Sequence, residues 1–200
     1  MPAMRELLIA TGNKGKLSEM LSILSGLSFT ILTLADVDAG GEVEETGKTL
    51  EENAILKAKT YGVRTGKLTI AEDTGLEVDA LGGGPGVQTA RYAEGSDDDR
   101  NQKLLGELQN VPDDKRGAQF RTVAAVYNPE TEEVRISEGV CRGRIAREGK
   151  GRRGFGYSPV FFVDELGKMM AELDDETRNS ISHRGKALVK ARDILIAEFS

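Results

Sequence analysis

Two adjacent carboxylates, Glu72 and Asp73, follow a short apolar run at residues 68–71. Such a run predicts a buried strand, and the ends of strands line the crevice where ligands bind in open α/β sheets. Like charges at close range oppose each other's ionisation, and a divalent cation relieves that repulsion. A solvated acidic turn is the structural alternative. The glycine-rich loop at residues 82–86 favours the cation site, because it lets backbone approach a ligand closely.

A phosphate site is predicted near the start of the chain, between a strand at residues 7–10 and a helix that begins at about residue 17. Backbone N–H groups and the positive end of the helix macrodipole bind anions at such a junction. Its side chains include two lysines, and the whole segment reads Thr11, Gly12, Asn13, Lys14, Gly15, Lys16. The glycine spacing of a Walker A loop is missing, so a structural βα turn is the alternative.

Two later segments combine basic and aromatic side chains. Residues 150–159 are basic and glycine-rich and contain Phe155 and Tyr157, and a second segment, residues 182–186, precedes the last predicted helix. His183 is followed closely by Arg184 and Lys186, and nearby positive charge disfavours its protonated form. It therefore suits an anion or a carbonyl oxygen better than general-base chemistry. A surface loop and a helix cap are the structural alternatives for the two segments.

The elements around these segments predict a mixed α/β fold. Apolar spacing at Leu17, Met20, Leu21 and Leu24 predicts the core face of the first helix. A capping box at residues 49–52 opens a helix that extends to about Tyr61, and on this helix Lys57 is expected to be a solvated charge. The further predicted elements are strands at residues 29–34, 118–127, 134–145 and 160–163, a turn at 128–130, and a helix that Ser96 and three aspartates begin. The hairpin after a βαβα half indicates two lobes.

Composition excludes several classes of protein. The 200 residues carry a net charge of −6, with 38% hydrophobic and 30% charged residues. The acidic balance argues against a nucleic-acid or membrane-surface binder, and no apolar run is long enough to span a membrane. A single cysteine fits a reducing compartment. One histidine and one cysteine exclude the usual zinc ligand sets.

Taken in order, the motifs resemble those of the inosine/xanthosine triphosphate pyrophosphatase family from about Leu7 to the last helix. The shared motifs are Thr-Gly-Asn at 11–13 with Lys16, Glu-Thr-Gly at 45–47, Glu-Asn-Ala at 52–54, Glu-Asp-Thr-Gly at 72–75, the glycine-rich loop, Ala-Arg-Tyr at 90–92, Phe-Gly-Tyr-x-Pro at 155–159 and Ser-His-Arg at 182–184.

The resemblance implies an elongated mixed β-sheet flanked by helices, with two lobes and a central nucleotide-binding cleft. It also implies one domain over residues 1–200 that hydrolyses ITP, dITP and XTP to the monophosphate and pyrophosphate and so keeps them out of nucleic acids. Mg²⁺ is the implied cofactor. A cytoplasmic homodimer that binds neither nucleic acid nor membrane is expected.

The resemblance also implies roles for individual residues. Asp73 would be the proton acceptor and a magnesium ligand, and Glu45 the second acidic group at the metal. The residues expected to bind the nucleotide are the segment from Thr11 to Lys16, Thr74, Phe155, Gly156, Tyr157, Ser158, Arg178, His183 and Arg184.

Three positions depart from the family pattern. Ser158 stands where an aspartate is usual, which could shift purine selectivity. Arg178 stands where many relatives carry lysine, which changes hydrogen-bond geometry. Glu72 replaces a common aspartate and has a longer arm.

Two other functions stay open on the sequence. A pyrophosphatase of the Maf type would act on other modified nucleotides, but the N-terminal Ser-x-Ser-Pro-Arg-Arg pattern of that group is missing. A nucleotide-binding module without turnover is the second, with Ser158 as its motivation. The sequence leaves open the preference among ITP, dITP and XTP, and whether Glu45, Glu52 or Glu72 lies nearest the metal.

Overall fold

A computed structural model describes residues 4–199 and divides the chain into two compact units. Unit 1 comprises residues 4–73, Thr122–Gly139 and residues 184–199, and unit 2 comprises Thr74–Arg121 and Val140–His183. The elements lying wholly or partly in unit 1 are β1 (Arg5–Ile9), α1 (Lys14–Leu24), β2 (Phe29–Thr33), α2 (Leu50–Thr65), β3 (Leu68–Val78), β5 (Gly117–Asn128), β6 (Glu133–Ile145) and α5 (His183–Phe199). Unit 2 takes the remaining parts of β3, β5 and β6 and adds β4 (Pro85–Gly86), α3 (Asp97–Glu107), β7 (Phe161–Val163), β8 (Lys168–Met169) and α4 (Asp175–Ile181).

The strands form an open mixed sheet with helices beside it, which confirms the predicted fold class. The hydrogen-bonded strand order is β2-β1-β3-β5-β6-β7-β8, and β4 pairs with β3. In unit 1, β1 runs parallel to both β2 and β3, with Leu7 opposite Ile31 on one side and Leu68 on the other. Parallel strands need a crossover connection, and α1 and α2 provide those connections.

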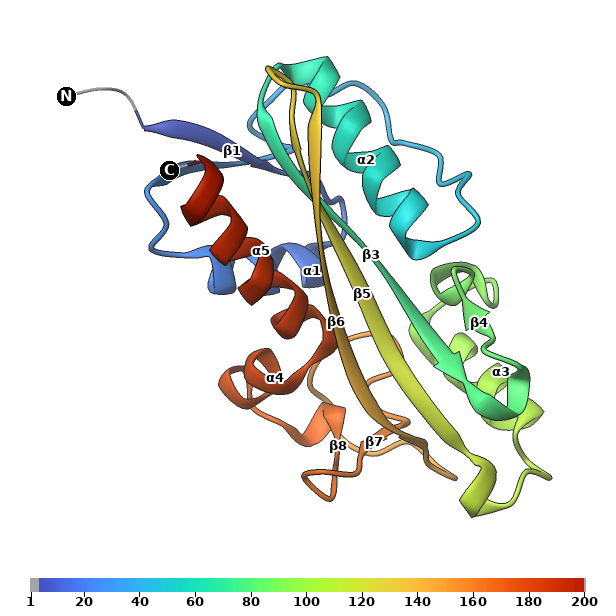
Figure 1. Cartoon of the computed structure of the whole chain (residues 1–200). Helices are drawn as coiled ribbons and strands as arrows, with labels where there is room; N and C mark the ends of the chain where they lie inside the picture. Colours follow the sequence, from blue (N-terminus) through green and yellow to red (C-terminus); the bar gives the residue numbers. More distant parts are fainter. Residues whose placement is uncertain (1–3, 200) are drawn as a thin grey trace. The chain divides into compact units, whose positions relative to one another are not determined.

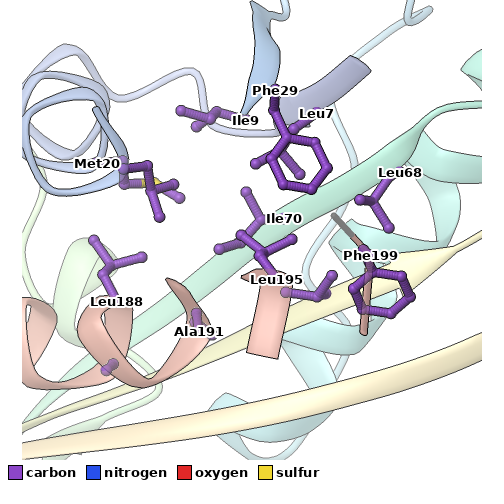
Figure 2. Close-up of a cluster of buried hydrophobic side chains, with 14 residues drawn as sticks. Leu7, Ile9, Met20, Phe29, Leu68, Ile70, Leu188, Ala191, Leu195 and Phe199 are labelled. Atoms are coloured by element: carbon purple, nitrogen blue, oxygen red, sulfur yellow. The ribbon is translucent and has the colours of Figure 1, made fainter. Parts of the chain in front are cut away.

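The core of unit 1 lies between its strands and the helices α1 and α5. Figure 2 shows Leu188, Ala191 and Leu195 of α5 directed toward apolar side chains of α1 and the strands. The other face is covered by α2 (Figure 1), where Gly62 approaches the ring of Tyr127. Leu21, expected in the core, is instead 39% exposed. It adjoins Met20 in the sequence, and α1 turns Met20 and Leu24 inward.

Side-chain caps begin the helices largely where the sequence predicts them. Thr49 accepts the Glu52 N–H at the start of α2, and Ser96 and Asp99 form a complete capping box at α3. Glu52 departs from the predicted box, because its carboxylate accepts from Lys48 N–H at 2.6 Å. The helix also continues beyond the predicted end near Tyr61 to a left-handed Gly66, a common helix C-cap.

Strand β3 is longer than the sequence predicts. The acidic pair lies inside this eleven-residue strand and not after its end. Its later residues form the antiparallel pairing with β4, with Leu76 opposite Gly86. An apolar run alone marks the fully buried part of a strand, and the pairing partner beyond it is not visible in local sequence.

Unit 2 has a second apolar core. Antiparallel pairs join β6 to β7 and β7 to β8, and their inward side chains pack with Leu104 and Leu108. The predicted hairpin strands appear as β5 and β6, whereas β4, β8 and α4 were not predicted. Among residues 4–199, no helix has both the length and the apolar character needed to cross a membrane.

Candidate active site

Asp73 is held by two side chains of α2. Asn53 Nδ2 donates to Asp73 Oδ2 at 3.2 Å, and Lys57 Nζ lies 3.1 Å from Asp73 Oδ1. Asn53 and Lys57 are four residues apart, so they occupy the same face of the helix. Both carboxylate oxygens therefore have fixed partners, and the side chain of Asp73 keeps 9% of its surface exposed.

Lys57 joins Asp73 to Glu45. Its ammonium lies 2.6 Å from Glu45 Oε1, and its side chain is 13% exposed. The expectation of a solvated helix charge is wrong, because this lysine bridges two carboxylates in unit 1. The i, i+4 spacing of Asn53 and Lys57 was a usable signal, but nothing local to α2 indicates that this face meets Asp73.

The segment that carries Glu45 is fixed through the same asparagine. Gly47 N–H donates to Asn53 Oδ1 at 2.7 Å. A Cβ at Gly47 would lie 2.5 Å from Asn53 Oδ1 and 2.9 Å from Asn53 N. One amide thus positions both Asp73 and the Glu45 segment. The close approach of Asn53 leaves no room for a Cβ at position 47, and this favours glycine there.

Gly47→Ala should therefore destabilise the protein by about 1–3 kcal/mol, as overpacking against fixed atoms does. Denaturant unfolding measures the loss of free energy of unfolding. Gly41→Ala in the same loop is the matched control, because a Cβ there meets nothing within 4 Å, and it should stay within about 0.5 kcal/mol of the parent. Equal stability of the two variants would contradict the assigned contact.

Burial and charge shift the pKa values of this group. Burial raises the pKa of Asp73 above its ordinary value, against the opposing charges of Lys57 and Lys16. Burial alone would lower the pKa of Lys57, but attraction to Asp73, Glu45 and Glu72 outweighs it and raises the pKa. Lys57 is thus a firmly charged ammonium beside a carboxylate that holds its proton more tightly than usual.

The predicted phosphate segment forms the start of α1. Asn13 is the N-cap of this helix, and its side chain accepts the Lys16 N–H at 3.0 Å. The Asn13 N–H is bound in turn by Thr11 Oγ1. Gly12 and Lys14 are exposed and Gly15 is half-buried. This leaves the positive end of α1, with Lys14 beside it, open to an anion.

The two other acidic candidates, Glu72 and Glu52, have other hydrogen-bond and ion-pair partners. Glu72 Oε1 lies 3.1 Å from Lys16 Nζ and accepts a 3.1 Å hydrogen bond from Arg184 Nε, and its side chain has no exposed surface. Glu52 is an exposed capping residue. Of the three glutamates left open by the sequence, Glu45 forms an ion pair with Lys57, the lysine that also pairs with Asp73.

The segment that carries Phe155 and Tyr157 lies in unit 2, and its side chains form hydrogen bonds within that unit. Tyr157 is buried, and its hydroxyl donates to Thr89 O at 2.9 Å. Burial raises the pKa of Tyr157 to about 12, so the hydroxyl keeps its proton. Ser158 Oγ donates to Phe155 O at 2.8 Å. Phe155 is half-buried, and of the two aromatic rings it alone is accessible for stacking.

The first two turns of α3 hold Gly156 through its N–H and its carbonyl oxygen. The Gly156 N–H donates to Asp97 Oδ2 at 2.7 Å, and Asn101 Nδ2 donates to Gly156 O at 3.1 Å. The N–H of Gly156, a residue expected to bind the nucleotide, is thus already bonded within unit 2. A cavity of about 260 Å³ opens beside these hydrogen bonds, and its lining includes Asn101, Phe155 and Gly154.

The remaining predicted site residues are mostly buried. His183 stacks on Phe120 with ring centroids 4.5 Å apart, and Arg178 NH2 pairs with Asp175 Oδ1 at 2.8 Å. Arg184 belongs to unit 1 and binds Glu19 and Glu72. Thr74 is half-buried and follows Asp73 in β3. The structure gathers the acidic and phosphate candidates in unit 1, and the Phe155 segment with His183 and Arg178 in unit 2.

Comparison with known proteins gives matches over nearly the whole chain. The model of the Ham1 family matches residues 7–194. A dITP/XTP pyrophosphatase of Desulforamulus reducens is 48% identical over 192 residues, which are 95% of each chain. That of Bacillus subtilis is 45% identical over 196 residues, 97% of this chain and 98% of its own. Among solved structures, a HAM1 protein of Coxiella burnetii has a TM-score of 0.89 and 39% identity, covering 96% of this chain and 99% of its own.

Proposed function

The chain belongs to the Ham1 family, and on that premise we propose that it hydrolyses the non-canonical purine triphosphates dITP, ITP and XTP to the monophosphate and pyrophosphate. The names of its relatives support the substrate class. The observation that carries the chemistry is the bonded group of Asp73, Lys57, Glu45 and Asn53. It combines a buried base with a fixed cation, and both suit hydrolysis of a phosphoanhydride.

Asp73 is the general base in this proposal. A carboxylate with a raised pKa holds a proton taken from water better than an ordinary aspartate does, which favours proton transfer near neutral pH. Asn53 and Lys57 fix its two oxygens, so the base is oriented before the substrate arrives. Activation of water by a positioned group is a recurrent part of phosphoryl transfer.

The triphosphate is assigned to the segment from Thr11 to Lys16. Lys14 and Lys16 flank the positive end of α1, and cationic groups there stabilise negative charge on the pyrophosphate leaving group. Lys57 adds a third cation next to Asp73. All of these groups lie in unit 1.

Glu45 and Asp73 fit Mg²⁺ as the cofactor. Mg²⁺ is usually held by one or two carboxylates together with substrate phosphates, and it keeps several waters. Within residues 4–199, no cluster of three or more histidine, cysteine, aspartate or glutamate side chains suits a metal ion, so a metal here would depend on phosphate ligands. When bound, the ion would lower the pKa of water and neutralise phosphate charge.

Recognition of the base is assigned to unit 2. Phe155 offers an accessible ring for stacking beside the cavity of about 260 Å³, and His183 and Arg178 supply donors for a 6-oxo group. Adenine would leave such donors unpaired, which a hydrogen-bonding site rejects strongly. Ser158 is neutral and bonded to Phe155 O, so any selectivity it brings acts through the shape of this segment.

Product analysis tests the proposed reaction. With dITP or XTP and Mg²⁺, the protein should release one pyrophosphate for each monophosphate, measured by ion-exchange separation of nucleotides and a coupled pyrophosphate assay. dATP, whose 6-amino group would leave these donors unpaired, should react at least about tenfold more slowly, the lower range for a misfit in a binding pocket. Diphosphate and free phosphate as products would contradict the proposal, and faster turnover of modified pyrimidines would favour a Maf-type activity.

A cytoplasmic homodimer completes the proposal. The dimer is supported by the family resemblance, and the cytoplasm is supported by the single cysteine, Cys141, which fits a reducing compartment. Light scattering coupled to gel filtration measures the mass in solution, and a mass near the 21.6 kDa of one chain would contradict the dimer.

A further inference from the structure

Unit 1 contains a buried chain of four charges with alternating sign. Glu19 Oε2 pairs with Arg184 NH1 at 2.6 Å, Arg184 Nε pairs with Glu72 Oε1 at 3.1 Å, and Glu72 Oε1 pairs with Lys16 Nζ at 3.1 Å. The exposed fraction of the side chains is 10% for Glu19, 4% for Arg184, 0% for Glu72 and 18% for Lys16. The exposed end of the chain is thus Lys16, in the phosphate segment.

These three ion pairs connect the elements α1, β3 and α5 to one another. Lys16 and Glu19 both lie on α1, Glu72 lies on β3, and Arg184 lies in the first turn of α5. Burying four charges is expensive unless each is paired with good geometry. The pairs therefore fix the first two turns of α1 against β3 and α5, and with them the lysine.

Arg184 is suited to the central place in this chain. A planar guanidinium presents N–H groups in fixed directions and can bind two carboxylates at once, which an ammonium cannot do with the same geometry. Burial alone would lower the pKa of Arg184, but Glu72 and Glu19 outweigh it and raise the pKa. Arg184 is consequently a permanent cation between two acids, and base recognition by its other N–H groups remains a prediction.

We propose that Glu19 and Arg184 are positioning residues that set the place of Lys16 through Glu72. Glu72 Oε1 is shared by Arg184 and Lys16. Glu19 binds NH1 of Arg184. This contact keeps the guanidinium from binding Glu72 through further N–H groups, which would displace Lys16 from Glu72. The inference rests on the proposed function, in which Lys16 binds the triphosphate.

The sign of the effect separates position from charge. Glu19→Gln removes a negative charge from the surroundings of an anion site, and this alone would tighten anion binding. Loss of positioning would instead leave Lys16 poorly placed and weaken binding. A weaker complex in Glu19→Gln therefore reports the position of Lys16 and not the local charge.

A double-mutant cycle between Glu19→Gln and Lys16→Met tests the proposal. The full-length protein is titrated with inorganic pyrophosphate by calorimetry in Mg²⁺ buffer, and kcat and KM are measured with dITP. Glu19→Gln alone should raise the Kd for pyrophosphate and the KM for dITP about tenfold, within the range of coupled neighbours. In the Lys16→Met background the same change should alter both by less than about twofold.

Each result bears on the proposal in one direction. If Glu19→Gln has the same effect with and without Lys16, or no effect in either, the positioning role is overturned. Arg184→Lys should behave as Glu19→Gln does, and it replaces that variant in the cycle if Glu19→Gln does not fold. Glu198→Gln, which breaks the exposed pair with Arg135, is the control for loss of a carboxylate in unit 1 and should change neither constant. Failure of the proposed function would look different, because the parent protein would bind pyrophosphate without hydrolysing dITP.

Discussion

Asp73→Asn should lower kcat for dITP about 10²- to 10⁴-fold, the contribution usual for a general base. The amide has the shape of the carboxylate but cannot accept a proton from water. Its effect on KM should be small unless the metal is lost as well, because the cationic groups that bind phosphate remain. Release of pyrophosphate at saturating dITP and Mg²⁺ measures kcat.

The fold should survive this substitution. Burial raises the pKa of Asp73, so folding disfavours its ionised form at neutral pH, and a neutral amide removes that penalty. Against this gain, one amide N–H group faces a donor, either Asn53 or Lys57. Thermal unfolding within a few degrees of the parent is expected, and Asp38→Asn, at an exposed aspartate, controls for the chemical change. A kcat above about one tenth of the parent value would exclude Asp73 as the base.

The sequence predicted most of unit 1 because the signals there are local. Strands β1 and β2 are apolar runs and Thr49 caps α2 as predicted, whereas α1 begins three residues before the predicted start and α2 continues past the predicted end to Gly66. Each of these signals depends on a few neighbouring residues, so it can be recognised before the tertiary structure is known. The two missed strands of unit 2, β4 and β8, are two residues long, and α4 has seven residues without a clear apolar face.

The candidate site was only partly predictable, for a physical reason. The acidic and phosphate motifs are contiguous in sequence, and the family resemblance assigns roles to them. The residues that orient them, Asn53, Lys57 and Glu19, lie on helix faces whose partners are remote in sequence. A charged residue on a helix is usually solvated, so only tertiary contacts distinguish Lys57 from an ordinary surface lysine. The role of Asp73 as the base therefore remains a prediction from the family resemblance. Its contacts with Asn53 and Lys57 give that role a physical basis.

Lys57→Met should lower kcat/KM for dITP by at least about tenfold in acidic buffer, because each pKa unit is a factor of ten in the ionised base there, and the loss should narrow as the pH rises. Lys57 lowers the pKa of Asp73 by its charge. Without it, Glu45 and Asp73 lose their shared cation, and desolvation together with like-charge repulsion raises the pKa of Asp73 further. The base is active only when ionised, so activity is lost as the pH falls through that pKa. The acid limb of the kcat/KM profile should move upward by at least about one pH unit relative to the parent.

The pH dependence distinguishes two roles for this lysine. If Lys57 acts through Asp73, the loss is greatest at low pH and diminishes in alkaline buffer, where the carboxylate regains its charge. If Lys57 contacted the substrate phosphates alone, kcat/KM would fall by the same factor at every pH, and the acid limb would stay in place. Lys59→Met changes an exposed lysine two residues along α2 and should leave both the rate and the profile unchanged. A uniform loss in Lys57→Met would thus remove Lys57 from the group that tunes the base, while leaving Asn53 as the residue that orients Asp73.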